Sequence, residues 1–304
     1  MGQICRSDGS LSKCGHHEPV KDRGRLLDRI TQAWVRVTGT RIQIAEFPWL
    51  DGPIGDPEFI GDAWLERETD RLGGTVQRGG GLLGDLSVLA AARFDPSKLE
   101  PAIVEFYEQT DQWRLDVWSQ WCPPAWLFGW VLSALFARRL HQLALPLRPL
   151  DTAFGMDSEV MSVIGDGGSQ LGAMWLRRLR SNGDTVYSGW YGTADLPITE
   201  HRSIKVTFPL PNGSLTVFLR PEVDDDGALV LTSPLSSFGD DGAYLVVAER
   251  DRQTASVRRV PLAERFRVFL DDEGILRTDH ALNLWTIPVI RLHYRLHRLA
   301  SWAS

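Results

Sequence analysis

The sequence has few of the residues that mark secreted, metal-binding or catalytic proteins. Its three cysteines, Cys5, Cys14 and Cys122, are too few and too irregular for a disulfide framework, which predicts a reducing, cytoplasmic setting. Cys5 and Cys14 with His16 and His17 match no standard zinc spacing, so we expect no metal there and leave the role of these residues open. No G-x-S-x-G, H-E-x-x-H, C-x-x-C or P-loop motif occurs, and no cofactor is predicted.

Lysine and net positive charge are also scarce. Only Lys13, Lys21, Lys98 and Lys205 are lysines among 33 basic residues, which we interpret as coding bias in a GC-rich genome. The formal net charge is -6 and the pI is about 5.7. A protein that binds duplex nucleic acid presents a basic surface, so the sequence predicts no nucleic-acid partner.

No hydrophobic run is long enough to cross a bilayer. The strongest candidate, residues 125–137 in WCPPAWLFGWVLSALFARRL, has 13 residues, whereas a span needs about 20. Pro124 can start a helix buried in the core or lying over a ligand as a lid. Alternatively, Trp126 and Trp130 rest at a membrane interface, and residues 125–141 make a peripheral membrane contact. The sequence leaves these alternatives open, so a cytoplasmic protein that is also membrane-associated is compatible with it.

Hydrophobic periodicity divides the chain into three parts. Residues 1–22 are polar, lack the apolar segment of a secretory signal, and predict a flexible leader. Residues 23–150 are predicted to be mainly helical, because apolar side chains recur there every three to four positions. Residues 151–304 alternate with a period of two and predict a domain like an antiparallel β-barrel, which can pack as one unit with residues 23–150.

Three helices are expected in the first half. The first has an apolar face formed by Leu26, Leu27, Ile30, Trp34 and Val37. The second runs from Pro57 to Leu72, between an N-cap at Asp56 and a terminating Gly73. The third starts after Asp95, and residues 113–121 behind it alternate like a strand.

The second half predicts about ten antiparallel strands joined by short turns, such as DDDG at 224–227 and DDEG at 271–274. A long meander of this kind curls into a barrel or a strongly curved sheet, because curling protects its edges. Several strands are apolar on both faces and therefore need cover on both. We predict an α+β fold in which the N-terminal helices pack on one face of the curved sheet or barrel and the other face lines an interior.

Four features of the second half follow one another in a particular order. A W-x-R strand with Trp175 and Arg177 is followed by YSGWYG, then by RFRVFL and a terminal LHYRL. In this order, roughly residues 150–298 resemble uncharacterised bacterial β-rich domains that occur alone or fused to dehydrogenase-like proteins. The resemblance implies a curved β domain; it implies no catalytic residues, since no activity is assigned to that group.

The stretch TVYSGWYGT is the strongest candidate for a ligand site. Tyr187 and Tyr191 fall on one face of the strand and Trp190 on the other, with gaps at Gly189 and Gly192. Glycine within a strand marks either a close approach by a ligand or a bulge at a barrel corner. Our leading hypothesis is a protein that binds a hydrophobic small molecule or lipid in a β-rich cup, with ligand-binding residues Tyr187, Trp190, Tyr191, Trp126, Trp130, Tyr294, Arg277 and Arg291.

His280 is the candidate catalytic residue. It lies on the apolar face of its strand, where it is either a core histidine bonded to backbone or an acid or base. An alternative function is therefore an enzyme that acts on an apolar substrate, with Arg277 or Arg291 holding an anionic group. His293 and its neighbouring arginines predict a solvated or anion-facing stripe rather than a metal site. A protein-interaction domain is the third hypothesis, and the oligomeric state stays open.

Overall fold

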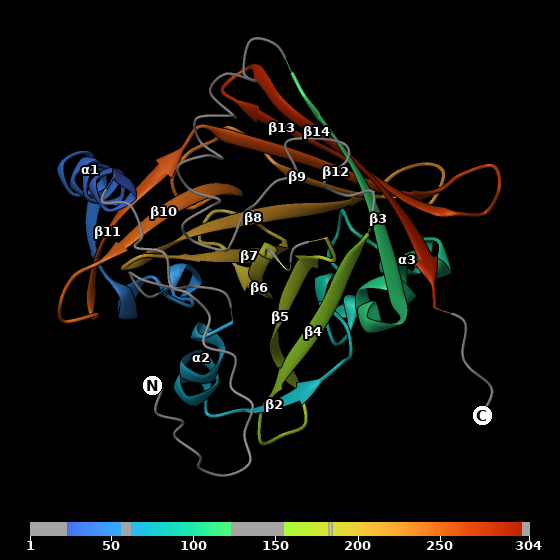
Figure 1. Ribbon diagram of the computed structural model, residues 1–304, viewed down its shortest axis with the longest axis horizontal. Coiled ribbons are helices and arrows are strands. Elements are labelled where there is room, and N and C mark those ends of the chain that lie inside the picture. Colours follow the sequence, from blue (N-terminus) through green and yellow to red (C-terminus); the bar gives the residue numbers. More distant parts are fainter. Residues whose placement is uncertain (1–22, 56–61, 123–154, 182, 184, 300–304) are drawn as a thin grey trace, which may run out of the picture.

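Most of the chain forms one large antiparallel sheet. A computed structural model describes residues 23–55, 62–122, 155–181, 183 and 185–299, and Figure 1 shows its three α-helices around the sheet. The helices are α1 (Arg23–Thr38), α2 (Trp64–Leu72) and α3 (Pro101–Glu108), with the 3-10 helices η1 (Ile44–Glu46), η2 (Pro48–Leu50), η3 (Leu86–Leu89), η4 (Pro96–Lys98) and η5 (Thr110–Gln112). The strands are β1 (Thr40–Gln43), β2 (Thr75–Arg78), β3 (Trp113–Trp121), β4 (Met156–Ile164), β5 (Gln170–Leu179), β6 (Thr185–Asp195), β7 (Arg202–Leu210), β8 (Gly213–Val223), β9 (Leu229–Ser233), β10 (Gly242–Ala248), β11 (Thr254–Val260), β12 (Leu262–Leu270), β13 (Leu276–Leu284) and β14 (Ile287–Arg298).

The sheet divides at β8. Its main path runs β2-β4-β5-β6-β7-β8-β9-β12-β13-β14-β3, and every strand pair in it is antiparallel. The first half of β8, residues 213–218, also pairs with β10, whereas residues 220–223 pair with β9. A side branch therefore leaves β8 through β10 and β11 to β1.

The sheet curls back on itself. Among the strands described, no hydrogen-bonded pair closes it into a barrel. Its two ends are β2 and β3, which do not pair with each other. β2 pairs with β4 along residues 161–164, and β3 lies near β4 without pairing with it. Val117 of β3 accordingly packs in one cluster with Met156 of β4 and Leu179 of β5. The predicted α+β fold with a large curved antiparallel sheet is confirmed at this level.

One end of the curled sheet is filled by the segment from residue 82 to residue 108. We call the face of the sheet that it covers the inner surface. Leu86 of η3 and Ile103 of α3 are fully buried there, in one core cluster with side chains from eleven strands. The strand residues of this part of the core include Trp113, Ala173, Ile204, Leu219, Leu229, Val268, Leu276 and Leu296. This packing makes residues 82–108 the floor of the fold.

The other two helices cover the remaining face and the side branch. α2 places Trp64 edge-on to Trp190 of β6, with 6.2 Å between ring centroids, and ends at Gly73 in the left-handed conformation, as its sequence predicted. α1 packs on β10 and β11 through Val35. Three residues of its expected apolar face, Ile30, Trp34 and Val37, are 54%, 41% and 83% exposed, and the ring of Trp34 meets the sheet only at Arg258 of β11 among the contacts described. 

Several expectations need correction or lie outside the described residues. The first half is less helical than predicted, because β1, β2 and β3 join strands of the second half in the same sheet. The third helix is interrupted: η4 ends before α3 begins at Pro101. Residues 1–22 and 125–141, including Trp126 and Trp130, lie outside the described parts. Within those parts, no helix is both long enough and apolar enough to cross a bilayer.

Candidate functional site

The inner surface brings polar and aromatic side chains together above the floor of the fold. Arg177 of β5 is opposite Tyr187 of β6. Tyr191 lies four residues further along β6 on the same face. Tyr294 of β14 reaches the same place from the other side of the curled sheet, since Arg177 lies 5.5 Å from the centroid of its ring. We call Arg177, Tyr187, Tyr191 and Tyr294 the interior cluster.

Arg177 is the unusual member of this cluster. Its side chain is 6% exposed and lies 4.4 Å from the ring centroids of both Trp175 and Tyr187. Among the described residues it makes no hydrogen bond or ion pair, and its Nε atom is buried without a partner. Cation-π contacts with three rings stabilise the charge but do not satisfy the N–H donors of the guanidinium.

The two tyrosines of β6 form a hydrogen-bonded pair. The hydroxyl of Tyr187 donates to that of Tyr191 across 2.8 Å, and both rings pack edge-on against Trp175. Burial raises the pKa of Tyr191 to about 12, and burial also raises the pKa of Tyr187 well above its usual range. Both hydroxyls are therefore protonated at neutral pH and available as hydrogen-bond donors or acceptors.

His280 lies on the inner surface and is paired with a carboxylate. Its Nε2 atom is 3.0 Å from Glu264 Oε2, and its ring stacks on Phe266 with centroids 3.7 Å apart. The side chains of His280 and Glu264 are only 10% and 11% exposed. Antiparallel pairing of β12 with β13 brings them together, since Phe266 is directly opposite His280 and Glu264 is the next residue on the same face of β12. A carboxylate that orients a histidine is compatible with acid–base chemistry and with a purely structural role.

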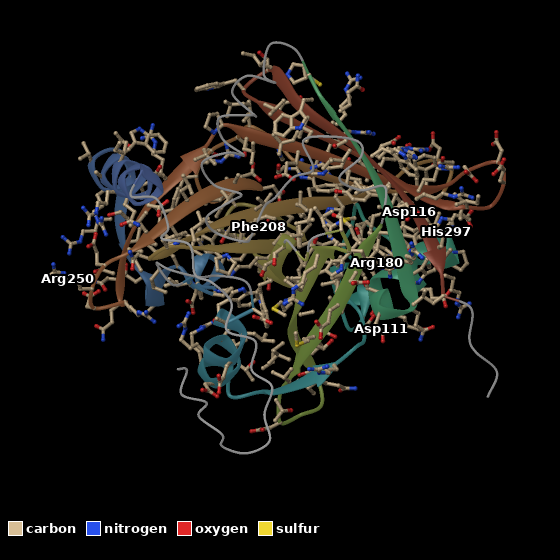
Figure 2. The ribbon with its side chains drawn as sticks, in the orientation of Figure 1. Asp111, Asp116, Arg180, Phe208, Arg250 and His297 are labelled. Carbon is tan, nitrogen blue, oxygen red and sulfur yellow. The ribbon has the colours of Figure 1, made fainter. Side chains whose placement is uncertain are left out.

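The inner surface is partly exposed at the end away from its floor. Phe208 of β7 is opposite Leu215 of β8, four residues away from the buried pair Ile204 and Leu219, and both are only partly buried. The label in Figure 2 marks Phe208 in the middle of the molecule. Other partly buried apolar residues in this region are Val260, Leu262, Phe266, Leu282 and Trp121. Partly buried apolar side chains therefore adjoin the interior cluster on this face.

Other residues singled out in the sequence do not face this interior. Trp190 points to the opposite face of β6, where it packs against Trp64. Arg277 forms an ion pair with Asp271, and Arg291 lines a groove on the outer face of the sheet. Both arginines alternate to the face of the sheet opposite His280, although His280 borders the groove that Arg291 lines, and Arg177 is a guanidinium on the face of His280.

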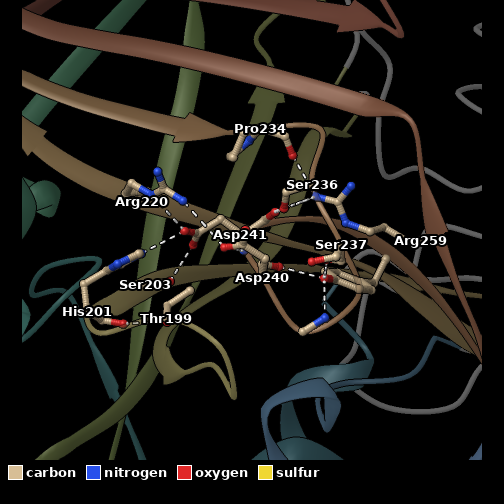
Figure 3. A network of polar contacts seen from close by, with 12 residues as sticks. Thr199, His201, Ser203, Arg220, Pro234, Ser236, Ser237, Asp240, Asp241 and Arg259 are labelled. Atoms are coloured by element: carbon tan, nitrogen blue, oxygen red, sulfur yellow. Dashed lines mark hydrogen bonds and ion pairs between the residues drawn. The ribbon is translucent and has the colours of Figure 1, made fainter.

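A buried carboxylate at Asp241 is a feature that the sequence did not reveal. Asp241 lies between Asp240 and Gly242, and its side chain is fully buried. As Figure 3 shows, it accepts hydrogen bonds from Ser203 Oγ at 2.6 Å and Arg220 Nε at 3.2 Å, and it lies 2.8 Å from His201 Nε2. His201 also lines a cavity of about 530 Å³. Only the partners' positions in space could have identified this network.

Comparisons with known proteins give one similarity at the level of sequence. No model of a known protein family matches this chain, and no solved structure matches it. The chain is similar to the uncharacterized membrane protein YndJ of Bacillus subtilis (strain 168). The two are 30% identical over an alignment of 229 residues, and the match covers 71% of this chain. The chain spans only 38% of the length of YndJ.

Proposed function

We propose that this protein binds an amphiphilic molecule, a lipid or a hydrophobic small molecule with an acidic group, on the inner surface of its curved sheet. In this proposal the sheet acts as a cup that is a partly closed barrel. Residues 82–108 form its floor, and the partly buried apolar side chains beside the interior cluster form its mouth. An apolar surface with a few convergent polar groups is the usual composition of a small-molecule site.

The buried guanidinium of Arg177 is the observation that carries this proposal. A charge that is removed from water without a partner costs several kcal/mol, which a carboxylate or phosphate of a ligand would offset. Arginine is suited to such a group because its N–H donors match two oxygen atoms of an acid at once. The hydroxyls of Tyr187 and Tyr191 lie beside it and are protonated at neutral pH.

We also propose that the protein takes its ligand from a membrane and contacts that membrane peripherally. YndJ is named as a membrane protein, and the match to it covers 71% of this chain. This similarity supports the proposed membrane contact. Residues 125–141 are the segment that the sequence suggested for the contact. A cytoplasmic protein with a peripheral contact of this kind would reach amphiphiles dissolved in the bilayer.

The test compares a fluorescent fatty acid, cis-parinarate, with its uncharged methyl ester. We expect wild-type protein to bind the acid about 10- to 100-fold more tightly than the ester, which is the usual effect of a charge-assisted hydrogen bond. Arg177→Met should lose this preference and keep its affinity for the ester. Arg178→Met is the matched control, because Arg178 follows in sequence but faces outward and pairs with Asp62.

Two results would contradict the proposal. One is an Arg177→Met variant that is folded by circular dichroism and still binds parinarate as tightly as wild type. The other is wild-type protein that binds neither probe and carries no lipid in native mass spectrometry.

The second candidate function is an enzyme that acts on an apolar substrate with His280 as acid or base. The contact between His280 and Glu264 favours it, because a carboxylate can hold the imidazole in one orientation. The test is to incubate a co-purifying ligand with wild type and with His280→Gln and to measure its mass. Conversion by wild type that His280→Gln abolishes would support catalysis, whereas equal conversion by both proteins would remove the proposed role.

A further inference from the structure

A groove of about 470 Å³ lies on the outer face of the sheet, opposite the inner surface, across β12, β13, β14 and β3. The side chains in its lining that matter here are Trp118, Gln120, Arg265, Ala281, Arg291 and His293. None of the four residues of the interior cluster contributes to this lining, although His280 and Leu292, which alternate to the inner surface, border the groove. The groove is therefore a second site, separate from the proposed ligand cup.

One row of residues across four strands determines the shape of the groove. Arg265 is opposite Ala281, Ala281 is opposite Arg291, and Arg291 is opposite Gln120. Arg265 is on β12 and Arg291 on β14, and these strands lie about 10 Å apart because β13 runs between them. The small side chain of Ala281 on β13 leaves space between the two arginines. Both guanidinium groups can therefore approach a single anion placed over Ala281.

The two arginines of this row have no counter-ion. Among the residues that the structure describes, neither Arg265 nor Arg291 makes a hydrogen bond or ion pair, unlike the arginines in the neighbouring rows. Arg267 pairs with Asp226. The carboxylate of Asp279 also lines the groove, and its Oδ1 lies 2.6 Å from His293 Nδ1. The groove therefore presents two guanidinium groups that form no ion pair with a described acidic residue.

Positive charge continues along the same face. Arg295 of β14 lies two residues from His293, and its Nε atom is buried without a partner. Asp116, which is opposite Arg295, pairs instead with His297 at 3.3 Å, and Figure 2 shows these two labelled residues close together. The basic character of this face is therefore local, since the protein as a whole has a net charge of -6.

Exposed apolar side chains lie beside the groove at the turn between β13 and β14. Leu284, Trp285 and Ile287 are 40%, 60% and 48% exposed, and Trp118 in the groove is 51% exposed. Trp285 has a φ of 52°, a left-handed conformation that is rare for a bulky residue. From Ala281 to Leu284 is about 10 Å along the strand, so the turn and the arginines can meet one surface together.

We propose that this outer face binds the phosphate group of an anionic phospholipid at a membrane surface. Arg265 and Arg291 hold the phosphate over Ala281, and the turn with Trp285 inserts among the headgroups. Free arginine charges next to exposed tryptophan match the charge and polarity of an anionic bilayer surface, whereas a soluble phosphate would have no use for the apolar turn. This inference rests on the membrane contact in the proposed function and names a second set of groups that makes it.

The experiment measures flotation of the full chain with phosphatidylcholine vesicles, with and without phosphatidylglycerol. We expect wild type to float only with the anionic vesicles. The variant Arg265→Gln/Arg291→Gln should bind them about thirtyfold more weakly. Its control is Arg180→Gln/Arg298→Gln, which removes the same charge from two exposed arginines that are paired with Asp157 and Glu105.

A second variant tests the apolar turn. Trp285→Asn suits the left-handed backbone, so it should fold normally and still weaken binding to anionic vesicles. Glycerol phosphate in solution is the remaining probe, and we expect it to bind far more weakly than the vesicles do.

Three outcomes would overturn the inference. If the double arginine variant floats like wild type, the groove is not the contact, although the membrane contact itself stands. If wild type floats with neither vesicle, the inference and the membrane contact both fail, and binding of parinarate in the cup is unaffected. If glycerol phosphate binds through the two arginines while vesicles do not, the source of the phosphate is soluble rather than a lipid.

Discussion

The buried amine of Lys205 should make the protein more stable as the pH rises from about 8 to about 10.5. Lys205 lies on β7, is 7% exposed, and donates a hydrogen bond to the backbone carbonyl of Asp51. Burial lowers its pKa to about 8, and the carboxylates of Asp51 and Glu68 reverse only part of this effect. Between pH 8 and pH 10.5, the ordinary pKa of a lysine, the native state thus binds fewer protons than the unfolded state.

The sign and size of the effect follow from proton linkage. Where the unfolded state binds more protons, the free energy of unfolding rises with pH. Below pH 8 the lysine is charged in both states and the full penalty of burying it is present, whereas above 10.5 the penalty is gone. The difference between the two pKa values corresponds to about 3 kcal/mol.

Urea unfolding of wild type and Lys205→Met at a series of pH values measures this penalty. We expect the methionine variant to be more stable near pH 7 by about 2 kcal/mol, since loss of the hydrogen bond to Asp51 offsets about 1 kcal/mol of the gain. The advantage should disappear towards pH 10.5. Comparing the two proteins cancels the opposite effect of buried tyrosines, whose raised pKa values lower stability above pH 10.

Lys98→Met is the control, because Lys98 is exposed. Its unfolding free energy should follow that of wild type at every pH. If Lys205→Met and wild type differ by the same amount at pH 7 and pH 10, then Lys205 is not held with a lowered pKa and the argument is refuted.

Two further substitutions test the packing of the sheet. Asp241→Asn should lower the free energy of unfolding by about 2–4 kcal/mol in urea titrations, because it leaves Arg220 without its buried carboxylate; a loss below about 1 kcal/mol would contradict this. Gly172→Ala should destabilise the protein by about 1–3 kcal/mol, since a Cβ there would lie 2.1 Å from the ring of Trp190. Gly167→Ala, where a Cβ meets nothing within 4 Å, should leave the melting temperature unchanged, and equal effects of the two alanines would disprove the steric explanation.

Regular alternation explains why most of the strands could be predicted. Segments such as residues 113–121 and 276–284 alternate in polarity, and each is a strand in the structure. The expected turns at 224–227 and 271–274 are also present, with Gly227 and Gly274 at positive φ. These features depend on neighbours in sequence, so a single sequence contains enough information for them.

Short edge strands could not be predicted in the same way. β2 has four exposed residues and therefore no alternation, and β1 buries only Ile42. Both exist because the backbone of an already formed strand, β4 or β11, offers a free edge for pairing. Pairing of this kind is decided by the partner, which the local pattern does not contain.

The candidate site was predictable in part. Alternation correctly placed Tyr187 and Tyr191 on one face and His280 away from Asp279. It did not indicate that Arg177 would be buried beside Tyr294 with no polar partner among the described residues, because Tyr294 is more than a hundred residues away in sequence. Nor did it indicate the partners of Asp241, which come from three separate strands and loops.

The sequence by itself determined the strands, most turns and the face of each strand on which a side chain lies, because these follow from backbone geometry and local polarity. Tertiary structure alone decided that β2 pairs with β4 and that β3 lies near β4 without pairing with it. It also decided that α1 turns Ile30 and Val37 to the outside. Such outcomes depend on competition between distant segments for the same edge or surface, which local periodicity does not encode.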